Sequence, residues 1–143
     1  MAAGDITVEV TVSGTLTSGD AIAAFSEEKV FSSIADVFQR TLLIGTTVQN
    51  ILLIGTVAGM TLSALNGLIV RNNDSTNFVT VGLIDDGVKS VYLKVMPGQA
   101  LVLTGAAIDC DDDAGGALGT LTNIDTVTLK ADTAACRCQV IAF

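Results

Sequence analysis

The fold of this chain is decided by residues 67–104, GLIVRNNDSTNFVTVGLIDDGVKSVYLKVMPGQALVLT. Four short apolar segments are separated here by three groups of turn-forming residues, which are Asn73-Asp74-Ser75, Asp85-Asp86-Gly87 and Met96-Pro97-Gly98-Gln99. Asn and Asp side chains bond to their own backbone, Gly adopts a positive φ without steric cost, and Pro presets φ at a turn corner. The stretch therefore predicts an antiparallel β-meander of four strands.

Strand signals continue on both sides of this stretch. In residues 5–12, Ile and Val alternate with Thr and Glu, and the last two apolar segments of the chain alternate in the same way. The chain is therefore predicted to form a single all-β domain over residues 1–143. We expect an antiparallel β-sandwich or jelly-roll-like fold with about eight to ten short strands and little helix. Residues 1–40 would hold an N-terminal strand and a candidate interface segment, and residues 67–143 the meander and the closing strands.

Residues 21–40 fit either a helix or strands, and they contain Phe25, Phe31 and Phe38. Because the chain has few other aromatic side chains, packing in the core is the favoured role for these rings. An interface with a neighbouring subunit is the alternative. The single tyrosine, Tyr92, is expected to point outward from its strand. There it could anchor an interface or lie along the sheet.

Residues 41–70 contain no charged side chain, and residues 51–70 are long enough to span a bilayer as a helix. Several Gly, Thr, Ser and Asn residues interrupt this run, and it lacks the Lys/Arg flank and aromatic anchors of a membrane span. Buried strands and turns are therefore favoured over a transmembrane helix. Near-continuous apolarity without alternation predicts burial on both faces, either within the domain or between subunits.

Composition narrows the class of partner. Hydrophobic residues make up 50% of the 143 residues, aromatic residues 4% and charged residues 15%, against about 25% charged in an average domain. The core must be aliphatic, and the weakly charged surface suits a protein that is covered in an assembly. The net charge of −8 disfavours binding to nucleic acid or to an anionic membrane. The basic residues are scattered and form no patch in the sequence.

The sequence lacks the side chains on which common catalytic sites depend. It contains no histidine, so no Ser-His-Asp or Cys-His arrangement is available. It also lacks a glycine-rich phosphate loop. We therefore expect a non-enzymatic protein with no catalytic residues and no cofactor. Cys136 and Cys138, two apart in one strand, and the distant Cys110 are expected to be buried free thiols.

An acidic run follows the stretch that decides the fold. Its carboxylates are Asp109, Asp111, Asp112 and Asp113. Closely spaced oxygen ligands are what calcium requires, but the spacing of an EF-hand loop is absent. A solvated loop is therefore favoured, and these four residues are only weak candidates for a metal site.

Three segments carry a resemblance to a known family, and they are LIVRNNDSTNFVTVG, VYLKVMPGQALVL and LKADTAACRCQVIAF. Their turns resemble those of small β-sandwich virion structural proteins of tailed bacteriophages. The positions that match are Asn72, Asp74, Thr76 and Asn77 in the first turn, Pro97 and Gly98 in the second, and residues 130–136 in the third. Met96 stands where a Lys or Ala is more usual. The resemblance covers residues 67–143 and leaves the first half of the chain unmatched.

This resemblance implies a capsid decoration, or cement, protein that is made in the host cytoplasm and binds the capsid surface of the virion. Its partners would be the major capsid protein and further copies of itself, as a homotrimer, without nucleic acid or membrane. Phe25, Phe31 and Phe38 would then contact neighbouring subunits. A neck or tail structural protein, and a small ligand-binding or calcium-binding β-sandwich, remain as alternatives.

Overall fold

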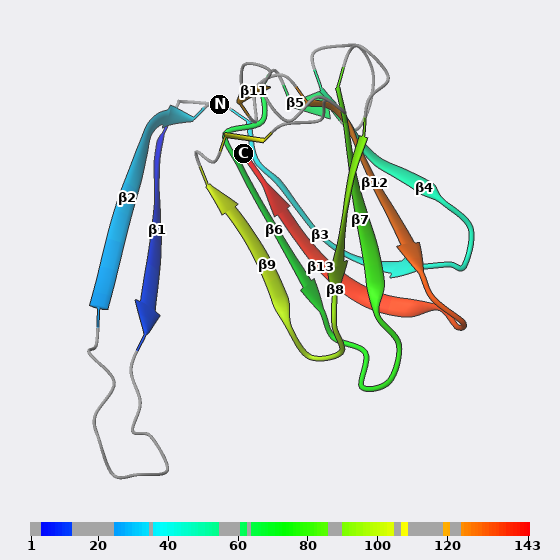
Figure 1. Ribbon diagram of the computed structural model, residues 1–143. Helices are drawn as coiled ribbons and strands as arrows, with labels where there is room; N and C mark the ends of the chain where they lie inside the picture. Colours follow the sequence, from blue (N-terminus) through cyan, green and yellow to red (C-terminus); the bar gives the residue numbers. More distant parts are fainter. Residues whose placement is uncertain are drawn as a thin grey trace, which may run out of the picture. The chain divides into compact units, whose positions relative to one another are not determined.

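The computed structural model of the chain describes residues 4–12, 25–34, 36–54, 61–62, 64–85, 90–104, 107–108, 119–120 and 124–143 (Figure 1). Every regular element in these ranges is a β-strand. The chain divides into two compact units, Met1–Ala35 and Asp36–Phe143. The first contains an antiparallel hairpin and the second a β-sandwich. That both units act as a single domain stays a prediction.

The hairpin consists of β1 (Gly4–Val12) and β2 (Phe25–Ile34). In its described part, the sandwich has eight strands of five or more residues, which are β3 (Phe38–Ile44), β4 (Gln49–Ile54), β6 (Gly67–Asn72), β7 (Val79–Asp85), β8 (Ser90–Val95), β9 (Ala100–Thr104), β12 (Ile124–Ala131) and β13 (Cys136–Ala142). Three two-residue strands accompany them, which are β5 (Thr61–Leu62), β10 (Ala107–Ile108) and β11 (Gly119–Thr120). In the part of the ambiguous segment 21–40 that the structure describes, β2 and the start of β3 are strand and no helix forms.

Two sheets form the sandwich, with strand orders β3-β13-β6-β9 and β5-β4-β12-β7-β8. All pairings in them are antiparallel except the short β4–β5 contact. The antiparallel pairs are nested along the chain, because β3 pairs with β13, β4 with β12, β6 with β9, and β7 with β8. Nested pairs divided between two sheets are the arrangement of a jelly roll. The predicted antiparallel, jelly-roll-like sandwich is thus confirmed.

The predicted β-meander over residues 67–104 is wrong in its connectivity. All four strands form, but only β7 and β8 pair as consecutive strands, whereas β6 pairs with β9. The chain crosses from one sheet to the other between β6 and β7, and again between β8 and β9. A crossing between layers uses the same turn residues as a hairpin, so turn composition shows where a strand stops and not what it pairs with.

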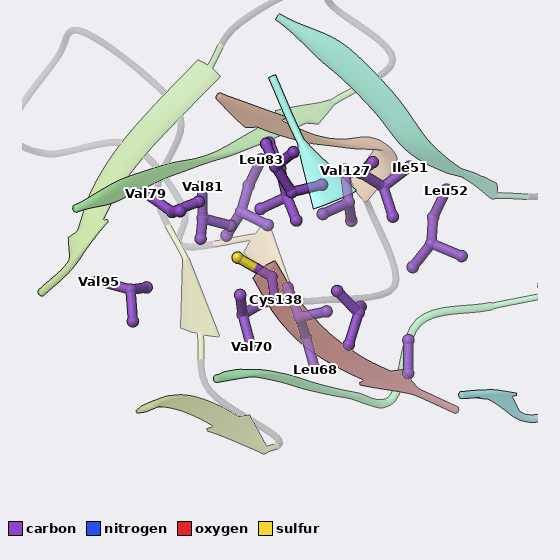
Figure 2. Packing of buried hydrophobic residues seen from close by; sticks show 14 of the residues in the cluster. Ile51, Leu52, Leu68, Val70, Val79, Val81, Leu83, Val95, Val127 and Cys138 are labelled. Carbon is purple, nitrogen blue, oxygen red and sulfur yellow. The ribbon is translucent and has the colours of Figure 1, made fainter. Parts of the chain in front are cut away.

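The core lies between the two sheets and is largely aliphatic (Figure 2). Val79 and Val81 of β7 are fully buried. Figure 2 shows Leu68, Val70 and Cys138 facing them from the other sheet. Alternation along each strand sends these side chains inward and the residues between them outward. Phe38 is the only aromatic ring in this buried cluster of described residues, in agreement with a composition poor in aromatics.

Strand β4 lies in the uncharged run 41–70, and a β-bulge accounts for the lack of alternation in this strand. Leu52 pairs with Val127 and Asn50 with Thr128, so Ile51 is an extra residue in a β-bulge. Both Ile51 and Leu52 are buried in the core, whereas Leu53 is 41% exposed. Among the described residues, β4 is therefore buried on its inner face only, and burial of its other face between subunits stays a prediction.

Because β4 and β6 begin and end the stretch 51–70, a transmembrane helix over that stretch is also ruled out. Within the described ranges, no helix has the length and apolarity to cross a membrane.

One end of the sandwich is tied together by its connections, at residues 45–48, 73–78, 96–99 and 132–135. We call it the Asn72 end. The Gly98 N–H donates to the Asp74 carbonyl at 3.0 Å, and the Thr133 hydroxyl donates to the Asn77 side-chain oxygen at 2.6 Å. Asn72 itself is fully buried, and its side-chain amide donates to carbonyls at both crossings. The polar residues at 72–77 therefore join strands, as predicted.

Candidate functional site

The structure gathers no metal-binding group in the part of the chain that it describes. No cluster of three or more His, Cys, Asp or Glu side chains that could hold a metal ion occurs there. The acidic run predicted as a weak calcium site lies outside the described residues, and its carboxylates are Asp109, Asp111, Asp112 and Asp113. The calcium hypothesis therefore stays a prediction.

Cys136 and Cys138 face the core and are free thiols, as predicted. Burial raises the pKa of the Cys136 thiol, and the Asp74 and Asp132 carboxylates raise it further. Burial also raises the pKa of Cys138 to about 11. A thiol with a raised pKa stays protonated at neutral pH, and a protonated thiol is a poor nucleophile and metal ligand. These two cysteines therefore pack the core as protonated thiols. Cys110 lies outside the described residues.

The outer face of the four-stranded sheet is uncharged apart from two arginines, and we call it the arginine face. Three rows of paired residues cross it, which are Gln39-Ile141-Ile69-Val102, Thr41-Gln139-Arg71-Ala100 and Leu43-Arg137. Leu43 is 68% exposed and Val102 is 42% exposed. The surface thus combines an apolar band with a cationic band.

Charge is distributed unevenly between this sheet and the rest of the chain. All three arginines of the chain, Arg40, Arg71 and Arg137, lie in its four strands, and none of the 15 carboxylates does. Arg71 and Arg137 are diagonal neighbours on the outer face, because Arg71 pairs with Gln139, two residues after Arg137. Arg40 lies on the edge strand β3, with its guanidinium 5.5 Å from the centre of the Phe38 ring. A chain of net charge −8 therefore carries one locally positive sheet.

Tyr92 lies on the outer face of the five-stranded sheet. It is 63% exposed on the edge strand β8 and pairs with Gly82. A Cβ atom at Gly82 would lie 3.0 Å from Cε1 of Tyr92 and would also meet the Thr128 hydroxyl, so the ring lies against the glycine. Thr128 is only 4% exposed. One face of the Tyr92 ring therefore packs on the sheet, and the other face is exposed to solvent. Lys94 and Lys130 lie on the same outer face, since both pair with Thr80.

The β1–β2 hairpin has one apolar face. It is formed by Ile6, Val8 and Val10 of β1, with Phe31, Lys29 and Glu27 opposite them in that order on β2. The Lys29 ammonium lies 5.1 Å from the centre of the Phe31 ring. Val10 is 42% exposed. This face therefore carries apolar surface that the two strands alone do not bury.

The other face of the hairpin carries a pair of like charges, and we call it the carboxylate face. Glu9 pairs directly with Glu28, and two like charges at this position repel. Hydroxyl groups of Thr11 and Ser26 donate to Glu9 Oε1 at 3.2 Å and 2.9 Å. Across both strands, four carboxylates stand against the single Lys29, which gives a net charge of −3. Val30, 51% exposed, lies beside the pair.

The residues predicted as interface anchors lie in different places. Phe25 begins β2 and pairs with Val12, and its side chain is outside what the structure describes. Phe31 is half-buried in the hairpin. Phe38 is 8% exposed in the core of the sandwich, which leaves its ring little surface for a partner. Tyr92 is exposed. Their roles at an interface stay predictions.

The arginine face is the feature that sequence reasoning missed. Arg71 and Arg137 are 66 positions apart, since 137 − 71 = 66. Only the order β13-β6 brings them together. One pattern in the sequence could have indicated this face, because every arginine lies in a strand that contains no carboxylate. No protein-family model, curated protein or solved structure matches this chain. The functional proposal therefore rests on the fold and on the surfaces described above.

Proposed function

We propose that this chain is a non-enzymatic virion structural protein, and most specifically a capsid decoration protein that binds at junctions between capsid subunits. The observation that carries the proposal is the nested strand pairing, in which β3 pairs with β13 and β4 with β12. This jelly-roll arrangement recurs in viral capsid domains. The turns at residues 72–77, 97–98 and 130–136 resemble those of virion proteins of tailed bacteriophages and support the same class.

Uncovered side chains supply the contact surface that such a role requires. A decoration protein stabilises a shell by burying area on neighbouring subunits, and an interface of more than about 1,000 Å² is expected. We assign the outer face of the five-stranded sheet to the major capsid protein, because it presents Tyr92 and the half-exposed Leu53. Exposed tyrosines that become buried on binding are common anchors of protein interfaces.

Co-sedimentation tests the proposal. Purified chain is mixed with capsids that lack it, and the pellet is examined by electron microscopy. We expect the chain to pellet with the capsids and to add density at subunit junctions. Tyr92→Ala should weaken binding by more than about tenfold. Val48→Ala is the matched control, because Val48 is 64% exposed in a connection outside the sheet face.

Two outcomes of this experiment would count against the proposal. Density at the neck or tail would replace decoration by a neck or tail role. Absence of the chain from every part of the virion would overturn the virion assignment altogether.

A further inference from the structure

The chain carries two uncovered surfaces of opposite charge, the carboxylate face of the hairpin and the arginine face of the sandwich. We propose that the carboxylate face of one copy docks on the arginine face of a second copy. The Glu9–Glu28 pair would meet Arg71 and Arg137, and Val30 would pack on the apolar row next to them. This inference assigns two surfaces to the self-association that the resemblance to decoration proteins implies, and it rests on that part of the proposed function alone.

The hairpin is expected to gain stability when a partner binds one of its faces. A two-stranded hairpin is marginally stable in water by itself, because it has no second layer to bury its side chains. Glu9 and Glu28 also repel each other across the two strands. Two cations placed over this pair would convert the repulsion into attraction. The described strands β1 and β2 contain Lys29 alone as a cation, and it lies on the apolar face against Phe31.

The arginine face has the matching properties. Arg71 and Arg137 are diagonal neighbours, so their guanidinium groups project from adjacent rows of one face. The Ile69–Ile141 pair and the exposed Val102 provide apolar surface beside them. A partner must bring carboxylates together with apolar surface, and the carboxylate face brings both through Glu9, Glu28 and Val30.

Charge complementarity favours a second copy as the occupant of the arginine face. Strands β1 and β2 carry four carboxylates and Lys29 as their one cation, whereas the four-stranded sheet carries three arginines and no carboxylate. Each copy therefore supplies both members of a matched pair of surfaces, so that copies can associate through them.

Charge reversal with full-length protein tests the proposal. The oligomeric state is measured by light scattering and sedimentation over a range of protein and salt concentrations. Wild type is expected to self-associate, and more weakly at high salt, because salt screens exposed charges. Arg71→Glu with Arg137→Glu, and separately Glu9→Lys with Glu28→Lys, should each weaken association by more than about tenfold. The four substitutions together should restore association, because the charges match again in the opposite sense.

The control reverses two charges on the other sheet, with Lys94→Glu and Lys130→Glu, and should leave association unchanged. All substituted side chains are exposed, so thermal melting followed by circular dichroism should show folded protein in every variant. A monomeric wild type at every concentration, or a fourfold variant as weak as either double variant, would overturn the proposal. The self-association test contains no capsids, so either result would leave capsid co-sedimentation unaffected. Failure of the docking proposal can therefore be told apart from failure of the proposed function.

Discussion

Replacement of Asn72 by Ala is expected to loosen the sandwich at its Asn72 end. The Asn72 side chain is fully buried and makes three hydrogen bonds. Its Nδ2 group donates to the Asn77 carbonyl at 2.8 Å and to the Val95 carbonyl at 3.1 Å, and its Oδ1 accepts from the Asp74 N–H at 3.0 Å. Val95 ends a strand of the opposite sheet, so this one side chain links the two layers.

The magnitude follows from the number of bonds. At about 1 kcal/mol for each lost hydrogen bond, Asn72→Ala should lower the free energy of unfolding by about 3 kcal/mol. The midpoint of thermal unfolding should then fall by about 6–12 °C. Asn72→Asp should cost more, since a carboxylate there would face two carbonyl oxygens that now accept from the amide.

Urea unfolding of the full chain, followed by circular dichroism, measures this effect. Asn73→Ala is the matched control, because it changes the same residue type one position away at an exposed site. The control should change the free energy of unfolding by less than about 0.5 kcal/mol. If Asn72→Ala were as mild as Asn73→Ala, the argument that Asn72 links the two sheets would be refuted.

Three further predictions concern the sandwich. Gly67→Ala places a Cβ atom 2.7 Å from Cε2 of Phe143, so it should cost about 1–3 kcal/mol of unfolding free energy. Gly45→Ala, with 3.9 Å to its nearest neighbour, should be mild, and equal urea midpoints for the two would contradict this packing. Hydrogen bonds from the Asn77 and Thr76 N–H groups hold the pKa of Asp74 below 3.8, so its stabilisation is present above that pH and is lost as the pH falls through the lowered pKa. Asp74→Asn should therefore flatten the acid limb of stability against pH, and an unchanged acid limb would contradict this role of Asp74. In a Cys110→Ser background, a thiol reagent should label Cys136 and Cys138 only after unfolding, and labelling of the folded protein at neutral pH would disprove their burial.

The sequence predicted the class of fold because the responsible signals are local. Alternation in β7 and β13 marks their inward side chains, and the turn residues near Asn72 and Pro97 mark where strands stop. Pairing is not a local property. The meander prediction failed because β6 finds its partner in β9, across a hairpin that lies in the other sheet.

The candidate surfaces were less accessible from sequence for the same reason. Tyr92 was expected to point outward, and its exposure of 63% agrees with that expectation. For Phe38 the scarcity of aromatic residues favoured the core over an interface, and its exposure of 8% agrees with the core. The arginine face depends on the lateral order of four strands, and the Glu9–Glu28 pair depends on the register of a hairpin. Neither property is encoded in the spacing of residues within one strand.

The nested pairing has a consequence for the time course of folding. Phe38 pairs with Ala142, and β13 lies between β3 and β6 in the finished sheet. Contacts between such distant positions form slowly, because a long loop must close before any contact is gained. While β13 is still inside the ribosome, β3 lacks the strand with which it pairs, and Arg137 is not yet part of the sheet. In the self-association proposed above, a nascent chain therefore cannot bind a folded neighbour through its own arginine face until β13 has been synthesised.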